Sequence, residues 1–292
     1  MRTRGTSFFD VVIFYGALTA FVASVVGVFL FLLLPTQTEQ VVESAPVITT
    51  LTQPLTTDTW GVFDPKTGIV ITGENLDTER PIASVSKLFT AYVVMESDKK
   101  DDAFTITATD VATYGRSGKL TYGEMVTPYT LLFPLLIESS NDAAVAISRY
   151  MGSEFETQIH SVTETLALSH THIVEPSGLS PRDISSVRDL AIFYAYLAKN
   201  KPHILDITRL PIYIALRDGY MNNNPAIKID AYKGGKHGFT DEAGRTFVGA
   251  FEGEDGKDVG VVLLGSTDLI HDIEILRTQG AKFAVASDIM AE

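Results

Sequence analysis

Two residues near the start of an apolar segment have the side chains and the spacing for nucleophilic chemistry. Ser84 lies three positions before Lys87 in the stretch PIASVSKLFTA. On a helix, residues three apart share a face, with Cβ atoms about 5 to 6 Å apart. A serine hydroxyl needs a base within hydrogen-bond reach, and a lysine is a base only when it is neutral. Burial and the positive end of a helix dipole both lower the pKa of a lysine toward that state.

Taken alone, this pair has a simpler interpretation, because S-x-x-K is a short pattern with many chance matches. In that interpretation Ser84 only caps a helix and Lys87 is a solvated charge. Two further motifs favour chemistry. Residues 139–141 (SSN) follow a predicted helical segment, and residues 236–238 (KHG) lie on a predicted late strand. The presence of all three segments, in this order, favours the chemical interpretation of the Ser84 and Lys87 pair.

The apolar pattern predicts the scaffold that positions these motifs. TWGVFD and GIVITG, joined by the turn DPKTG, predict a β-hairpin over residues 59–73. Spacing near 3.6 predicts helices over residues 84–97, 127–151, 153–168 and 186–200. Pro134 should kink or split the second, and residues 186–189 form a capping box for the last. Three strands (AIKIDAYKGG, GRTFVGAFEG and KDVGVVLLGS) and a helix over residues 269–286 follow. This order predicts an antiparallel sheet with an inserted helical lobe.

Composition excludes several classes of protein. The chain has 292 residues, 45% of them hydrophobic, and a net charge of -13, as expected of a folded, acidic protein. Because no dense stripe of lysine and arginine exists to neutralise phosphates, we expect no nucleic-acid partner. The absence of cysteine excludes a thiolate nucleophile and a cysteine-ligated zinc site.

The N-terminal segment predicts attachment to a membrane. Residues 11–34 contain no charge, and at about 1.5 Å per residue a helix of that length spans a bilayer core of about 30 Å. Arg2 and Arg4 precede it, which places residues 1–10 in the cytoplasm. A cleaved signal peptide is the alternative, but its shorter apolar core and small-x-small cleavage site are missing. Residues 35–57 then form a linker, and residues 58–292 a single catalytic domain outside the cell membrane.

With these motifs the chain resembles the low-molecular-mass penicillin-binding proteins, the serine D-alanyl-D-alanine carboxypeptidases. The similarity runs through PIASVSKLFTA, LLIESSNDAAVAIS, EPSGLSPRD, SSVRDLAIF, MNNNPAI and GGKHGFTDEAG. The resemblance implies the α/β (α+β) β-lactamase/transpeptidase-like fold, with an antiparallel sheet flanked by helices. It also implies peptidoglycan stem peptides ending in D-Ala-D-Ala and β-lactam antibiotics as binding partners, and no metal or organic cofactor.

The resemblance assigns four residues to catalysis: Ser84, Lys87, Ser139 and Asn141. By this likeness Ser84 attacks the carbonyl of the penultimate D-alanine and Lys87 is the base. Ser139 relays protons to the leaving amine. Asn141 holds the substrate amide and helps to fix Lys87.

The resemblance assigns four further residues to substrate binding: Lys236, His237, Gly238 and Phe239. Lys236 supplies positive charge near the substrate carboxylate, and the backbone N–H groups of Ser84 and Phe239 form the oxyanion hole. His237 departs from the family, which usually has threonine or serine there. Imidazole can donate a hydrogen bond, carry a charge at mildly acid pH, or block the groove.

A literal match to the family's third motif occurs in the wrong place. Lys66, Thr67 and Gly68 spell K-T-G, but they precede the nucleophile and lie in the hairpin turn, so we assign them no catalytic role. The pair His170 and His172 has a spacing compatible with a metal, but nothing else completes a site, and surface histidines are the expectation. Glu138 is expected to line the helical lobe rather than to act as an acid.

Three functions remain open at this stage. The first is the carboxypeptidase. A β-lactamase would need a deacylating glutamate in an E-x-x-L-N segment, which we do not find, and Glu175 belongs to a stretch that matches the carboxypeptidases. A catalytically silent peptidoglycan-binding protein is suggested only by His237.

Overall fold

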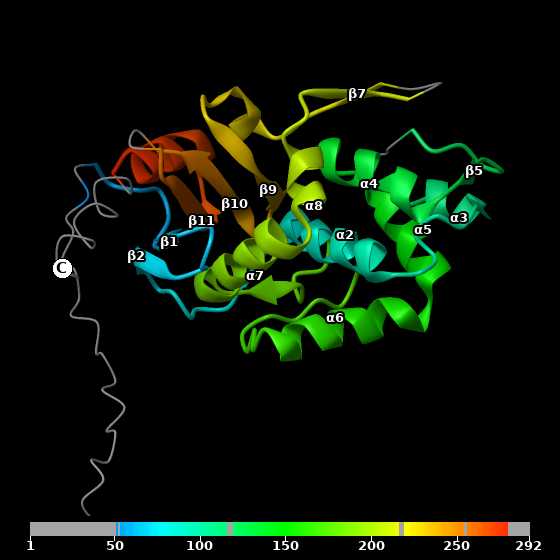
Figure 1. Cartoon of the computed structure of the whole chain (residues 1–292), viewed down its shortest axis with the longest axis horizontal. Helices are drawn as coiled ribbons and strands as arrows, with labels where there is room; N and C mark the ends of the chain where they lie inside the picture. Colours follow the sequence, from blue (N-terminus) through cyan, green and yellow to red (C-terminus); the bar gives the residue numbers. More distant parts are fainter. Residues whose placement is uncertain (1–50, 52, 116–118, 216–218, 254–255, 280–292) are drawn as a thin grey trace, which may run out of the picture. The chain divides into compact units, whose positions relative to one another are not determined.

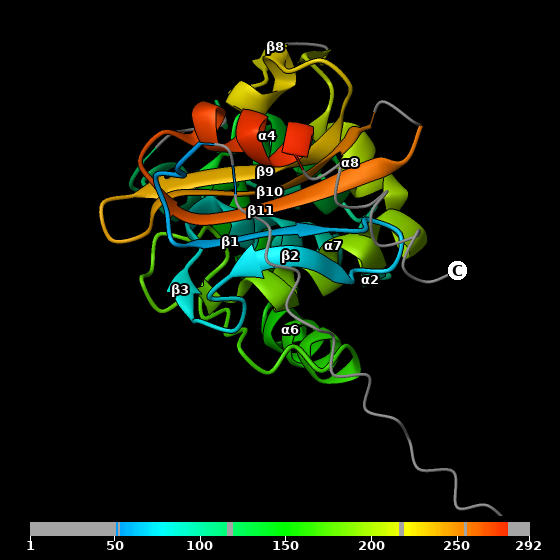
Figure 2. The ribbon, with the colours of Figure 1, turned by 90° about the vertical axis from the view of Figure 1, so that its left-hand side faces the viewer.

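The computed structural model describes residue 51 and residues 53–115, 119–215, 219–253 and 256–279, all within the compact unit formed by residues 48–292. Its centre is a five-stranded antiparallel sheet in the order β2-β1-β11-β10-β9. Figure 2 shows these strands one above another, from β2 at the bottom to β9 at the top. The strands are β1 (Thr59–Phe63), β2 (Val70–Glu74), β9 (Tyr232–Thr240), β10 (Gly244–Glu252) and β11 (Asp258–Ser266). The predicted hairpin and the two last predicted strands are confirmed.

The two faces of the sheet bury separate apolar cores, because side chains alternate along a strand. On β11, Val261 and Leu263 pack with the helix at residues 269–279, on the left in Figure 1. Val262 and Leu264 point to the other face and join the larger core under the helices. The sheet therefore lies between one C-terminal helix and a helical lobe.

The helices of the lobe come from the middle of the chain (Figure 1). They are η1 (Ala83–Ser86), α2 (Lys87–Glu96), α3 (Ala108–Val111), α4 (Pro128–Ile137), α5 (Asn141–Met151), α6 (Ser153–Thr165), α7 (Val187–Asn200) and α8 (Pro202–Thr208). Three short antiparallel pairs accompany them: β3 (Arg80–Pro81) with β6 (Ile184–Ser185), β4 (Phe104–Thr105) with β5 (Met125–Val126), and β7 (Ile212–Ile214) with β8 (Gly219–Met221). α2 contacts α4, α5 and α6, and its first eight residues are buried. The helix that follows Ser84 is thus the central helix of the lobe.

The predicted helix over residues 127–151 is broken, but not where we expected. Pro134 remains inside α4, and the break falls at residues 138–140, where Ser139 has a φ of 61°. Ser140 then caps α5, because its Oγ accepts a hydrogen bond from the N–H of Ala143 at 2.9 Å. The second motif therefore occupies a turn between two helices.

Two other boundaries differ from the prediction, and the predicted cap at Ser186 is confirmed. Ser84 lies in a 3₁₀ turn, η1, and the α-helix begins only at Lys87. The strand predicted from Ile227 begins at Tyr232, since Asn224 caps a 3₁₀ helix, η2 (Pro225–Lys228). Ser186 caps α7 through the N–H of Asp189, and the last helix is described only to residue 279.

The predicted membrane helix over residues 11–34 lies outside the described residues and stays a prediction. Within the described part of the chain, no helix has the length and apolar character needed to cross a bilayer. The end of the predicted linker contacts the folded unit: the Thr56 hydroxyl donates to Asp272 Oδ2 at 2.6 Å, and Asp272 is fully buried.

Candidate active site

Ser84 stands on a constrained turn at the foot of α2. The preceding residue, Ala83, has a φ of 47°, a left-handed conformation that costs a non-glycine residue about 1 to 3 kcal/mol. The backbone of Gly178 presses against this turn so closely that a Cβ there would overlap the Ala83 carbonyl, and Gly178 itself has a φ of 81°. The turn is thus held from outside, and Ser84 remains partly exposed at the surface of a cavity.

Lys87 is fully buried one helical turn later, and its ammonium nitrogen is surrounded by three acceptors. Nζ lies 3.1 Å from Ser84 Oγ, 2.8 Å from Asn141 Oδ1 and 2.5 Å from the carbonyl oxygen of Ser177. When Nζ is neutral it keeps two N–H groups and gains a lone pair. Asn141 and Ser177 can then accept the two N–H bonds, which leaves the lone pair for the hydroxyl proton of Ser84.

Burial lowers the pKa of Lys87 to about 7, although the negative charges of Glu175, Asp183 and Asp142 oppose the shift. A lysine with this pKa is about half neutral at pH 7, whereas an ordinary lysine is almost wholly charged. The lysine therefore meets the electrostatic requirement for a base that accepts the Ser84 proton.

The turn between α4 and α5 brings the second motif to the same place. Asn141 is buried, and its Nδ2 donates to the carbonyl oxygen of Tyr114 at 3.1 Å. This contact orients the amide so that Oδ1 faces Lys87. Ser139 is partly exposed and lines the same cavity as Ser84.

The third motif lies on β9, the last strand in the sheet order, next to η1. Gly238 approaches so closely that a Cβ on it would lie 2.6 Å from the backbone nitrogen of Ser84. Lys236 is 1% exposed, its Nζ donates to the His237 carbonyl at 2.7 Å, and burial together with Lys87 lowers its pKa well below the usual value. Phe239 is 56% exposed, and its ring stacks beneath the Arg245 guanidinium.

His237 is neutral in this setting, which corrects one of our expectations. Burial, followed by the charges of Lys236, Arg245 and Lys87, lowers the pKa of His237 to about 2. This low pKa disfavours a charged imidazole at mildly acid pH and favours a neutral ring that can still form hydrogen bonds. Its Nδ1 is buried without a partner among the described residues.

A cavity of about 460 Å³ joins the three motifs. Six of the predicted site residues line it: Ser84, Ser139, Asn141, His237, Gly238 and Phe239. The sequence did not single out Gly115, Leu179, Asn223 or Thr240, which complete the wall. Glu138 also lines the cavity, where it pairs with Lys119 at 3.0 Å.

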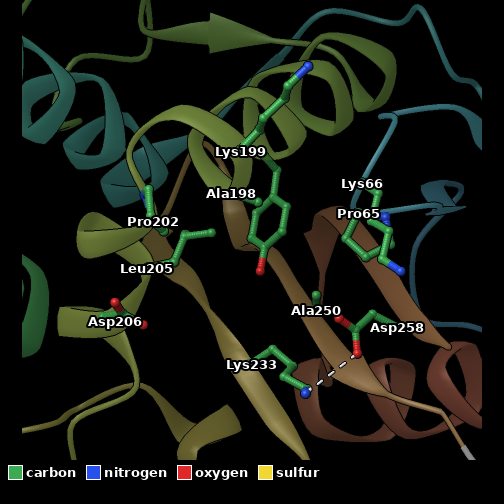
Figure 3. A pocket seen from close by; sticks show the side chains of 11 residues that line it. Pro65, Lys66, Ala198, Lys199, Pro202, Leu205, Asp206, Lys233, Ala250 and Asp258 are labelled. Carbon is green, nitrogen blue, oxygen red and sulfur yellow. Dashed lines mark ion pairs between the residues drawn. The ribbon is translucent and has the colours of Figure 1, made fainter. Parts of the chain in front are cut away.

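A second cavity of about 540 Å³ contains none of the predicted catalytic residues. Figure 3 shows its side chains, among them Lys66 of the literal K-T-G and the ion pair of Lys233 with Asp258, whose atoms lie 3.7 Å apart. Lys66 is exposed, as expected for a turn residue. Elsewhere, the backbone N–H of His170 donates to Asp189, and the described residues hold no cluster of three or more potential metal ligands.

The sequence did not reveal the role of the segment EPSGLS. This segment accepts a hydrogen bond from Lys87 through the backbone carbonyl of Ser177, and no residue type in the sequence indicates such a backbone contact. The Glu175 side chain accepts hydrogen bonds from the backbone N–H groups of Ser177 and Leu179 within the same turn. A glutamate followed by Pro-Ser-Gly is a possible sequence signal, since a carboxylate there can gather the N–H groups of the turn.

Comparison with known proteins agrees with this geometry. A family described as D-alanyl-D-alanine carboxypeptidase matches residues 46–267. A D-alanyl-D-alanine endopeptidase of Pseudomonas aeruginosa is 30% identical over 202 residues, which are 64% of this chain and 64% of that protein. The chain thus spans less than two thirds of that relative's length.

Two solved structures are similar over most of their length. The D-alanyl-D-alanine carboxypeptidase of Mycobacterium tuberculosis H37Rv has a TM-score of 0.73 at 25% identity, covering 82% of this chain and 95% of the other. The penicillin-binding protein D2 of Listeria monocytogenes, in its cefotaxime-bound form, has a TM-score of 0.67 at 25% identity, covering 77% and 96%. The predicted α/β fold, with an antiparallel sheet and helices, is confirmed.

Proposed function

Because the chain belongs to the D-alanyl-D-alanine carboxypeptidase family of serine peptidases, we propose that it removes the terminal D-alanine from peptidoglycan stem peptides through an acyl-enzyme on Ser84. The observation that carries the proposal is the 3.1 Å contact between Ser84 Oγ and the buried Nζ of Lys87, whose pKa is about 7. A nucleophile with a matched base is the central requirement of this chemistry.

The proposed acylation is one balanced sequence of bond changes. Ser84 Oγ bonds to the carbonyl carbon of the penultimate D-alanine while its proton moves to Lys87 Nζ. The carbonyl electron pair collects on oxygen, near the Ser84 and Phe239 backbone N–H groups. As the pair returns, the C–N bond breaks and the amine of the leaving D-alanine takes a proton, relayed through Ser139. Water then hydrolyses the ester and restores Ser84.

The arrangement of β9 supports recognition of a peptide. It ends the sheet order, so an extended substrate can add along its outer edge, as in strand addition. Burial lowers the pKa of Lys236 in the free protein, and a bound terminal carboxylate would favour its charged form again, so Lys236 can pair with that carboxylate. His237, being neutral, can offer one N–H donor in place of the family's usual hydroxyl.

Glu175 gives no support to the β-lactamase alternative. Its carboxylate accepts hydrogen bonds from the N–H groups of Ser177, Leu179 and Ser180 and from the Ser177 hydroxyl. A carboxylate so occupied is poorly placed to activate a water.

We further propose that residues 11–34 anchor the protein in the cell membrane, with the catalytic domain on the outer side near the peptidoglycan and accessible to β-lactams.

Intact-protein mass spectrometry of the full chain in detergent, after incubation with benzylpenicillin, tests the proposal. We expect a long-lived adduct of one penicillin on the wild type and none on Ser84→Ala, with Lys66→Ala as a control that still forms the adduct. We also expect release of D-alanine from a synthetic peptide ending in D-Ala-D-Ala. A folded wild type that takes no penicillin and releases no D-alanine would favour the silent binder. Rapid turnover of penicillin would favour the β-lactamase.

A further inference from the structure

Two buried carboxyl groups close to Lys87 take no part in the mechanism above. Asp183 is fully buried, Glu175 is partly buried, and the charges of both act on Lys87. They belong to the segment between α6 and α7, whose Ser177 carbonyl accepts a hydrogen bond from Lys87 Nζ. Buried carboxyl groups are costly unless they are well partnered, so their presence requires a physical reason.

Glu175 organises the turn that delivers this carbonyl. One of its oxygens accepts from the Ser177 N–H at 2.9 Å and the Ser177 hydroxyl at 2.8 Å. The other accepts from the Leu179 N–H at 2.5 Å. These bonds close the turn around Gly178, whose backbone presses on Ala83. Glu175 thus fixes both the carbonyl that faces Lys87 and the contact behind the nucleophile.

Asp183 is satisfied on one oxygen and not on the other. Its Oδ1 accepts from the backbone N–H groups of Val174 at 2.6 Å and Glu175 at 3.1 Å. Its Oδ2 is buried without a donor among the described residues, and the Glu175 carboxyl group is close enough to the Asp183 carboxyl group to interact with it. Two ionised carboxylates in this position would repel each other. A proton on Oδ2 removes the repulsion and converts the orphaned oxygen into a donor to Glu175.

Building on the proposed function, we propose that Glu175 and Asp183 hold one proton between them and act as positioning residues for Lys87. Asp183 carries the proton and donates it to the ionised Glu175, which in turn holds the Ser177 carbonyl against Nζ. The pair then presents one negative charge to Lys87 instead of two. The other charged groups that act on Lys87 or lie near it are Asp142, from α5, and Lys236, from β9.

The titration of the two groups is consistent with this arrangement. Burial, together with the charge of Glu175, raises the pKa of Asp183 to about 7. Burial also acts to raise the pKa of Glu175, but the hydrogen bonds from Ser177, Asp183 and Ser180 together hold that pKa below the usual value. When two carboxyl groups share one proton, one of them has a raised pKa and the other a lowered pKa, as found for Asp183 and Glu175.

Three variants of the full chain test the proposal through acylation by a fluorescent penicillin. In Asp183→Asn the amide N–H₂ replaces the proposed proton, and its oxygen still accepts from Val174. We expect acylation within about threefold of the wild type, whereas Asp183→Leu and Glu175→Gln slow it roughly 10- to 100-fold through misplacement of Lys87. Loss of the negative charge in Glu175→Gln should also shift the rise of the rate with pH to lower pH, which a merely structural role would not do.

Unfolding by urea between pH 4 and pH 7 supplies a readout that needs no activity. The pKa of Asp183 is higher in the folded state than its ordinary 3.8, so the wild type should lose stability relative to Asp183→Asn as pH rises through this window. Parallel curves for the two proteins, or an Asp183→Asn variant as slow in acylation as Asp183→Leu, would overturn the proposal. A wild type that takes no penicillin would refute the proposed function, while the unfolding comparison would still decide whether the proton is shared.

Discussion

The pKa of Lys87 determines how the rate of acylation should depend on pH. In the proposed mechanism the neutral lysine is the active form, so the rate should rise with pH. With a pKa of about 7, about 1% of Lys87 is neutral at pH 5 and about half at pH 7. We therefore expect the second-order rate constant for acylation by penicillin to rise roughly 50-fold over these two pH units. For an ordinary lysine the rate would instead keep rising almost tenfold per pH unit up to about pH 9.

The measurement is stopped-flow labelling of the full chain with a fluorescent penicillin at pH values from 5 to 9, at constant ionic strength. Lys87→Arg is the matched control, because a guanidinium remains charged throughout this range and should abolish labelling at every pH. A rate that is constant from pH 5 to pH 7, or one that rises without curvature to pH 9, would refute the role of burial in preparing the base.

Three further variants probe the surroundings of the site. His237→Thr should make the free energy of unfolding less sensitive to acid. The imidazole has a pKa of about 2 in the folded state, so the wild type loses stability as pH falls below about 6.5. In urea unfolding we expect this loss to reach about 1 to 2 kcal/mol at pH 5 in the wild type and to be absent from the variant. Gly178→Ala combines an unfavourable φ of 81° with overlap of the Ala83 carbonyl. We therefore expect the free energy of unfolding to fall by more than about 3 kcal/mol in urea and penicillin labelling to decrease. Unchanged stability would contradict the close approach of the two backbones. Lys66→Ala should change stability by less than about 0.5 kcal/mol and leave labelling intact, and a loss of labelling would contradict its assignment to a simple turn.

The side chains that meet at the candidate site were largely predictable from the sequence, because their types, order and spacing can be seen directly along the chain. Ser84 and Lys87 are three residues apart, and the contact between them needs only a helical turn. The order of the three motifs also excluded Lys66, which lies in a turn as expected.

The features that tune the site depend on contacts between distant segments, and the sequence does not display them. The neutrality of His237 results from burial and from charges on other elements. The break at residues 138–140 follows from Ser139 taking a left-handed conformation, although Pro134 is the stronger helix breaker by type. The Ser177 carbonyl is a backbone atom, so no side-chain pattern could identify it.

The order of strands in the sheet has a consequence for the folding of the chain. Thr59 on β1 pairs with Leu264 on β11, and the turn that carries Ser84 contacts β9, which is joined to β1 through β10 and β11. Pairings between residues so far apart in the sequence form slowly, because the intervening chain must first be closed into a loop. A nascent chain that has not yet reached β11 already contains β9, but it lacks the strand that joins β10 to β1 and so completes the sheet beside the Ser84 turn. Competence for acylation should appear only in the last stage of folding, which makes the appearance of penicillin labelling a kinetic marker of sheet closure.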